Sequence, residues 1–239
     1  GPRTATASAS GPIRPASHAV DGTVTLRTPQ AGPLLARTGI QGSGSLAATL
    51  RITGLWDRPM ADIDAQAGDA VLQGVTLGSI DLKALLDDRG TLNISSCTLS
   101  NRASVLTVRG DVRLFRRFPD IETDPEVDLN MDVRGMNPAD FYRTVPLAGA
   151  VDGRITAAGR ISGLSAELYL TGKGLSSGDI RIGDAELAGN LNRGVLGISS
   201  LTVTNGRSTL RATGDMTLFD DQTGRVVPDP PIHLKVTGD

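Results

Sequence analysis

Residues 89–115 and 193–219 carry the same segment twice, 104 positions apart. The first copy reads RGTLNISSCTLSNRASVLTVRGDVRLF and the second reads RGVLGISSLTVTNGRSTLRATGDMTLF, with 14 of 27 aligned positions identical. Apolar and polar residues alternate through both copies. A repeat of this length, filled with this pattern, predicts a stack of β units rather than one closed globule.

The repeat sets the expected domain organisation. We expect residues 1–22 to be a disordered head, because they are mostly Ala, Ser, Thr, Gly and Pro. Within it, Gly1-Pro2 resembles the remnant of a cleaved tag. The first β repeat is expected over 23–119 and the second over 120–223. Residues 224–239 match the first strand of a further repeat, which predicts a piece cut from a longer protein.

The composition excludes several classes of function. Aromatic residues make up 3% of the chain, too few to fill the thick core of a compact domain. The net charge of −2 argues against a nucleic-acid partner, since such proteins carry a basic stripe. No run approaches 18 consecutive apolar residues, so no membrane-spanning segment is expected, and any anchor would lie outside this sequence.

From Thr23 onward the hydrophobic pattern has a period of two, which predicts strands with one apolar and one solvated face. Equivalent positions of the two copies should therefore face the same side of the sheet. The residues that we expect to line the apolar face are Leu92, Ile94, Leu106, Val108, Val112, Leu114, Leu129, Met131, Val133, Ile155, Ile161, Leu168, Leu170, Ile180, Ile182, Leu196, Ile198, Leu210, Met216 and Leu218.

The breaks in this pattern carry turn signals. Asn205-Gly206 is typical of a tight hairpin, since both residues tolerate positive φ. Ser95-Ser96 and Ser199-Ser200 interrupt the alternation at matching places, which predicts a β-bulge in each copy. Residues 137–143 begin with Asn-Pro and have an acid in the first turn, which predicts a short helix, and residues 33–37 are its partial counterpart.

No group of residues predicts catalysis, a cofactor or a metal. The two histidines, His18 and His233, have no duplicated counterparts. Cys97 stands where the second copy has Leu201, so we expect a small buried apolar side chain rather than a nucleophile. The acidic residues of 120–128 have the charge to attract calcium, but the segment lacks the glycine of a calcium loop, which favours a solvated linker.

Two short motifs are explained by strand structure. Gly42-Ser43-Gly44 resembles the start of a dinucleotide-binding loop, but no third glycine or helix follows it. Arg109-Gly110-Asp111 spells an adhesion tripeptide, but only its Gly-Asp recurs in the second copy, which favours a shared strand position.

The apolar face is what remains to carry a function. The sheet can curl until this face closes on itself, or it can stay open as a groove. An exposed apolar strip longer than a few hundred Å² usually marks a binding site. A long apolar trough with charged outer walls suits acyl chains, which need burial and little directional bonding.

The pattern over 149–218, GAVDGRITAAGRISGLSAELYLTGKGLSSGDIRIGDAELAGNLNRGVLGISSLTVTNGRSTLRATGDMTL, resembles the TamB family, and more loosely the wider AsmA-like group. The resemblance covers about residues 23–239. It implies an all-β fold described as a β-taco: an elongated, repetitive, curled sheet with an apolar concave groove and one or two short helices. It also implies a periplasmic protein anchored in the inner membrane, which moves phospholipid between membranes and meets an outer-membrane barrel of the TamA type.

Three functions compete on this basis. The first is a lipid conduit that carries phospholipid acyl chains along the groove. The second is a chaperone-like scaffold for outer-membrane barrels and autotransporters, in which a nascent strand adds to the groove or to an edge strand. The third is a closed β-solenoid of an adhesin or passenger domain. Enzyme activity has the least support.

Overall fold

A computed structural model describes residues 6–10, 13–14, 19–36, 41–141, 147–218, 227 and 231–239. The chain divides into two compact units. Unit 1 comprises Gly1–Arg102 and Thr107–Pro125, and unit 2 comprises Ala103–Leu106 and Glu126–Asp239. The main boundary therefore falls after Pro125, six residues beyond the predicted start of the second repeat at residue 120.

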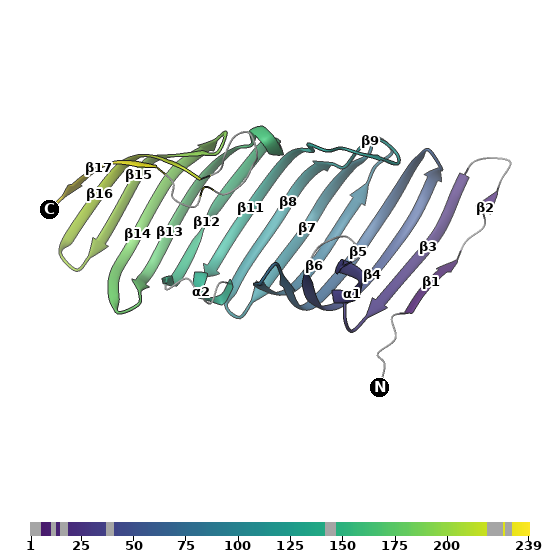
Figure 1. The fold of residues 1–239 in the computed structure, drawn as a ribbon, viewed down its shortest axis with the longest axis horizontal. Helices are drawn as coiled ribbons and strands as arrows, with labels where there is room; N and C mark the ends of the chain where they lie inside the picture. Colours follow the sequence, from purple (N-terminus) through teal and green to yellow (C-terminus); the bar gives the residue numbers. More distant parts are fainter. Residues whose placement is uncertain are drawn as a thin grey trace. The chain divides into compact units, whose positions relative to one another are not determined.

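Unit 1 is an antiparallel sheet whose strands follow one another in chain order (Figure 1). Its strands are β1 (Thr6–Ser10), β2 (Ile13–Arg14), β3 (Ala19–Thr28), β4 (Gly42–Leu55), β5 (Arg58–Leu72), β6 (Val75–Leu86), β7 (Thr91–Asn101) and β8 (Ser104–Arg113), the last of which begins in unit 2. A separate two-stranded sheet pairs β9 (Phe115–Arg117) with β10 (Asp120–Ile121).

Unit 2 repeats this arrangement, again with neighbouring strands antiparallel and in chain order (Figure 1). Its further strands are β11 (Glu126–Met136), β12 (Leu147–Arg160), β13 (Ser165–Ser177), β14 (Ile180–Asn192), β15 (Val195–Asn205), β16 (Ser208–Thr217) and β17 (Ile232–Gly238). The predicted all-β fold, a curled sheet that is not closed into a barrel, is confirmed.

Both predicted short helices are confirmed. Helix α1 spans Gly32–Ala36 and α2 spans Pro138–Phe141. Asn137 caps α2, because its side-chain oxygen accepts a hydrogen bond from the N–H of Ala139 at 3.2 Å. A 3₁₀ turn over Ile161–Gly163 was not predicted.

The predicted β-bulges are present at both serine pairs. In β7 the register changes so that Lys83 pairs with Ser96 and Ala84 with Ile94, which leaves Ser95 as the extra residue. In β15 the register changes between the partners of Ala188 and Gly189, leaving Ser199 extra. The Ser95 hydroxyl donates to the carbonyl of Lys83 at 2.9 Å, which satisfies a group of the disturbed ladder.

The hairpin at Asn205-Gly206 forms one residue later than the prediction. Asn205 pairs with Ser208, so Gly206 and Arg207 make the loop. The Asn205 side chain instead donates to the carbonyl of Arg181 at 2.9 Å. Asn101 makes the equivalent bond to Thr76 in the first copy, at 3.0 Å. The asparagine is thus kept in both copies for a side-chain bond to the neighbouring strand and not for its own backbone conformation.

Two predictions for the connecting segments are wrong. The head is not disordered where it is described, because Thr6–Ser10 pairs with β3; edge pairing needs only backbone groups, which Ala, Ser and Thr supply. The segment 120–128 is not simply a solvated linker either. Glu122 is buried and accepts two hydrogen bonds from Arg116, at 3.1 and 3.2 Å. Residues 1–5, 11–12 and 15–18 of the head, including His18, lie outside the described residues.

Ser104 is the anchor of α2 in unit 2. It is fully buried, at 0% exposure. Its hydroxyl oxygen accepts the N–H of Asn137 at 2.9 Å and lies 3.0 Å from a carboxylate oxygen of Asp140. The hydroxyl thus accepts a hydrogen bond from the backbone N–H of Asn137 and donates one to the carboxylate of Asp140 in α2.

Replacing Ser104 with alanine is expected to destabilise unit 2 by about 1–3 kcal/mol, because it leaves a buried N–H and a carboxylate oxygen without their partner. Urea denaturation measured by circular dichroism tests this. Ser208 aligns with Ser104 but is exposed, so Ser208→Ala is the matched control and should stay within about 0.5 kcal/mol of the unmodified protein. Equal losses in the two variants would contradict the anchoring role.

Candidate functional site

Unit 2 presents one apolar face, built from rows of side chains that cross its strands. Residues paired directly opposite each other in an antiparallel sheet point to the same side. The four rows, read from β11 or β12 to β17, are Val133–Gly153–Leu170–Leu187–Leu201–Ala212–Val236, Met131–Ile155–Leu168–Gly189–Ile198–Gly214–Leu234, Leu129–Ala157–Ala166–Leu191–Leu196–Met216–Ile232 and Val151–Gly172–Ala185–Val203–Leu210–Gly238.

Unit 1 has its own apolar face of the same construction. Its rows, read from β3 to β7, are Val24–Leu50–Ile63–Ala84–Ile94, Leu26–Ala48–Ala65–Leu82–Cys97, Gly22–Ile52–Ala61–Leu86–Leu92 and Thr28–Leu46–Ala67–Ile80–Leu99. Except at Thr28 and Cys97, these rows contain only aliphatic residues and glycine. Each face therefore offers carbon and hydrogen and almost no directional bonding groups.

Small and large residues are mixed along the rows, so the surface of each apolar face is uneven. Ala61, Ala84, Ala157, Ala166 and Ala212 are buried, with exposures between 3% and 9%. The long aliphatic side chains between them are mostly only half-buried. A second layer of structure would bury these leucines and isoleucines fully. Among the described residues, the only helical pieces are α1, α2 and the 3₁₀ turn, so the apolar faces stay largely uncovered.

The opposite face of unit 2 is polar. Arg154 contacts Asp132 at 3.3 Å and Lys173 contacts Asp184 at 3.1 Å. The pKa of Asp184 lies below its usual range, because the N–H of Gly174 and the ammonium of Lys173 both stabilise the carboxylate. Tyr169, which alternates with the apolar leucines of β13, is 62% exposed. The alternation predicted from the sequence therefore separates two chemically different faces.

Most of the predicted apolar-face residues lie in these rows or continue them. Twelve of them belong to the rows: Leu92, Ile94, Leu129, Met131, Val133, Ile155, Leu168, Leu170, Leu196, Ile198, Leu210 and Met216. Leu106, Val108, Val112 and Leu114 are half-buried in or just after β8, as are Leu218 after β16 and Ile182 at an irregularity of β14.

Two predicted residues lie outside the rows. Ile161 is 58% exposed in the 3₁₀ turn, and Ile180 is 70% exposed at the hairpin end of β14. The prediction rested on the local alternation of Ile180 with Ile182. It was wrong for Ile180, which directly follows the turn at Gly178-Asp179 and is exposed there.

Other residues of the faces were missed. Leu175 packs over Gly149 and Gly172, whose missing side chains leave room for it. Its place is hidden from the sequence because the register between β13 and β14 shifts on both sides of Leu175. By contrast, Leu187, Leu191 and Leu201 follow the two-residue period and could have been found from it.

Cys97 lies in a row of unit 1 beside Leu82, and its counterpart Leu201 lies beside Leu187 in unit 2. It is half-buried, and burial raises the pKa of its thiol above the ordinary value. A raised thiol pKa means that ionisation opposes folding. The stability that the protonated thiol contributes is fully present below the ordinary thiol pKa. It is lost as the pH rises through the raised pKa of the folded state.

Cys97 is therefore expected to react with a bulky maleimide much more slowly in the folded protein than in urea at the same pH, because both access and thiolate fraction are lower. The rate in the folded state should rise only above the pH at which a free cysteine accelerates. Cys97→Leu, which copies the second repeat, should fold normally and abolish labelling. Equal rates in the folded and denatured states would contradict the placement.

The remaining motifs add no second site. Arg109-Gly110-Asp111 lies within β8, where Asp111 accepts a hydrogen bond from Asn93 at 2.7 Å, and Gly42-Ser43-Gly44 lies within β4. His233 is exposed beside Asp215, at 3.2 Å. Within the described ranges, no cluster of three His, Cys, Asp or Glu residues suits a metal ion, and no helix has the length and hydropathy to cross a membrane.

Comparison with known proteins gives no relative: no family model, curated protein or solved structure matches this chain.

Proposed function

We propose that this protein carries phospholipid acyl chains on the apolar faces of its two units. The observation that supports this most is the set of half-buried aliphatic rows, over which the described residues place no covering layer. Burial of an acyl chain against such rows is favourable by about 0.8 kcal/mol per methylene group. A chain of ordinary length would therefore gain enough to be held, even on a partly exposed face.

The composition of the rows also supports movement along them. Hydrophobic attraction has no preferred direction and depends on the area that is covered. In the row through Leu168, the glycines Gly189 and Gly214 alternate with large side chains, so the surface is uneven but has no polar group to bind a chain at one point. Such a surface suits sliding better than fixed binding.

Two other functions fit these faces less well. A closed solenoid needs a fully buried core, and the open sheet with half-buried leucines does not favour it. A scaffold for nascent β-strands would use the backbone groups of an edge strand, and this would leave the aliphatic composition of the rows without a role. The lipid conduit therefore accounts best for the composition of the faces.

Photocrosslinking tests the proposal directly. A benzophenone amino acid at Leu170, on the apolar face of unit 2, is expected to crosslink phospholipid when the protein is expressed in a bacterial envelope. The matched control is Thr171, the next residue on the same strand, which is exposed on the other face and should give no lipid adduct. Adducts of a protein strand at position 170, without lipid, would overturn the conduit in favour of the scaffold.

Native mass spectrometry gives an independent measurement. After purification without harsh detergent, the protein is expected to retain phospholipid, with masses that match the lipids of the expression host. A protein that is folded by circular dichroism but carries no lipid under these conditions would contradict the proposal.

On the resemblance to the TamB family we also propose the cellular setting. The chain would work in the periplasm as part of a protein anchored in the inner membrane, and an outer-membrane barrel of the TamA type would be its partner. Crosslinking of the full-length parent in cells, followed by identification of the captured barrel, tests this part separately.

A further inference from the structure

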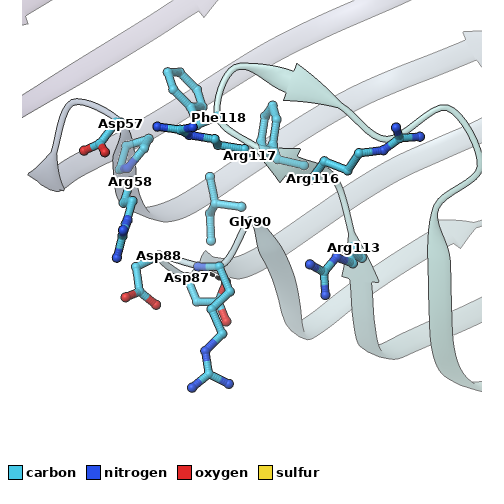
Figure 2. A pocket seen from close by; sticks show the side chains of 13 residues that line it. Asp57, Arg58, Asp87, Asp88, Gly90, Arg113, Arg116, Arg117 and Phe118 are labelled. Carbon is cyan, nitrogen blue, oxygen red and sulfur yellow. Dashed lines mark hydrogen bonds between the residues drawn. The ribbon is translucent and has the colours of Figure 1, made fainter.

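Unit 1 has a pocket at one end of its apolar face, with a volume of about 630 Å³. The turn between β4 and β5, the turn between β6 and β7, and the segment that leaves β8 form its walls (Figure 2). Gly90 fixes this arrangement. Its carbonyl accepts the N–H groups of both Leu114 and Phe115, and its lack of a side chain lets Phe115 pack against it.

The pocket combines a cationic rim with an apolar floor. Five arginines line it, namely Arg58, Arg89, Arg113, Arg116 and Arg117, against the three acids Asp57, Asp87 and Asp88. Pro59, Leu86, Phe115 and Phe118 supply the apolar part, and the two phenylalanine rings contact edge to face at 5.4 Å. Leu86 also belongs to the row Ala61–Leu86–Leu92, so the floor continues into the apolar face of unit 1.

Most of these arginines are free to bind an anion. Arg116 is held by Glu122, and Asp87 is occupied by the N–H groups of Arg89 and Thr91. Among the described residues, Arg58, Arg89, Arg113 and Arg117 have no carboxylate within ion-pairing distance. In the view of Figure 2, Arg58 lies on one side of Gly90 and Arg113 on the other.

The repeat indicates that the fold does not require these charges. Arg113 aligns with Thr217, and Arg116 and Arg117 align with Asp220 and Asp221 at the same offset of 104. A residue needed only to close the sheet would recur in both copies, as the carbonyls of Gly90 and Gly194 do in bonding to Leu114 and Leu218. Arg89 does recur, as Arg193, so the part of the cationic rim that is found in the first copy alone is Arg113, Arg116 and Arg117.

We propose that this pocket binds the phosphate group of a phospholipid, with Arg58, Arg89, Arg113 and Arg117 around the phosphate and the first carbons of the lipid on Leu86, Phe115 and Phe118. Guanidinium groups bind phosphate through two parallel N–H bonds, so a cluster of unpaired arginines suits it. The apolar floor selects an amphiphilic phosphate over a free one. This inference rests on the proposed function, for which it names a headgroup site where acyl chains enter or leave the face of unit 1.

The chain carries its own reporter for the test. Trp56 is its only tryptophan; it is 65% exposed and directly precedes Asp57 of the pocket wall. Its fluorescence is titrated with dihexanoyl phosphatidylglycerol below the micelle concentration, with dihexanoylglycerol, which lacks the phosphate, and with inorganic phosphate. The phospholipid is expected to bind most tightly of the three, and its affinity should fall as salt is added.

The variant R113Q/R117Q is expected to weaken phospholipid binding about tenfold or more, since it removes two charge-assisted contacts. The control R51Q/R134Q removes the same charge from exposed positions outside the pocket and should bind like the unmodified chain. Equal affinity of R113Q/R117Q and the unmodified chain for the phospholipid would overturn the proposal. Inorganic phosphate binding as tightly as the lipid would also overturn it, by assigning the pocket to a free anion.

This outcome is separable from the proposed function itself. If the pocket binds no short-chain phospholipid while crosslinking at position 170 still captures lipid, the apolar faces carry acyl chains without a headgroup site here. If short-chain lipid binds the pocket but position 170 captures none, the headgroup site stands and the conduit along unit 2 fails.

Discussion

Leu168→Asp is expected to abolish lipid transfer by the full-length parent protein while the chain still folds. Leu168 lies inside a row, between Ile155 and Gly189, so its side chain belongs to the surface on which acyl chains would lie. A carboxylate among acyl chains is poorly solvated and costs several kcal/mol. Because the side chain is only half-buried and faces a glycine, the sheet itself should tolerate the change.

The measurement is transfer of labelled phospholipid between membranes in cells that express the parent protein, with expression level and membrane placement checked in parallel. Tyr169→Asp is the matched control, since Tyr169 is the next residue and is 62% exposed on the other face. Ile180→Asp is a second control, because Ile180 is 70% exposed at a hairpin end. Equal transfer by Leu168→Asp and Tyr169→Asp would show that the apolar face is not the lipid path.

Gly183→Ala is expected to cause a large loss of stability in unit 2. Gly183 is buried with φ of 106°, and an added Cβ would overlap the carbonyl oxygen of Thr204 on the neighbouring strand. The strained backbone alone costs about 1–3 kcal/mol, and the overlap adds to it because a backbone atom must move. Gly78, its counterpart in unit 1, has φ of 77° and meets Ser100 in the same way.

Two other glycines separate the causes of this loss in thermal or urea denaturation. Gly206 has φ of 65° but open space around it, so Gly206→Ala should show the conformational cost alone. Gly163 has open space and no positive φ, so Gly163→Ala should be nearly neutral. If Gly183→Ala is no more destabilising than Gly206→Ala, the contact with Thr204 contributes nothing.

The repeat and the two-residue period were enough to predict much of this molecule. The alternation through Leu168, Tyr169 and Leu170 is a local property of extended backbone, because successive side chains must point to opposite faces. The bulges at Ser95 and Ser199 were predictable for a related reason. When the alternation of apolar and polar residues is interrupted at the same place in both copies, each strand must contain an extra residue there, which forms a bulge.

Predictions were wrong where pairing partners decide the outcome. The position of Leu175 on the apolar face depends on the register shifts between β13 and β14, which cannot be read from either strand alone. The head at Thr6–Ser10 has no apolar residue larger than alanine, yet it pairs with β3 because an edge strand offers its backbone groups to any extended neighbour. Both results come from contacts between segments rather than from local preference.

The sequence by itself determined the strands, their apolar parity and their duplication, because these depend on backbone geometry and on neighbouring residues in one chain. The tertiary structure alone decided which side chains stand next to one another across strands, and so turned separate leucines into continuous rows. It also brought Arg58 at the start of β5, Arg89 in the turn before β7 and Arg113 at the end of β8 to the rim of one pocket. No spacing in the sequence encodes that meeting, because it depends on the register of four strand pairs.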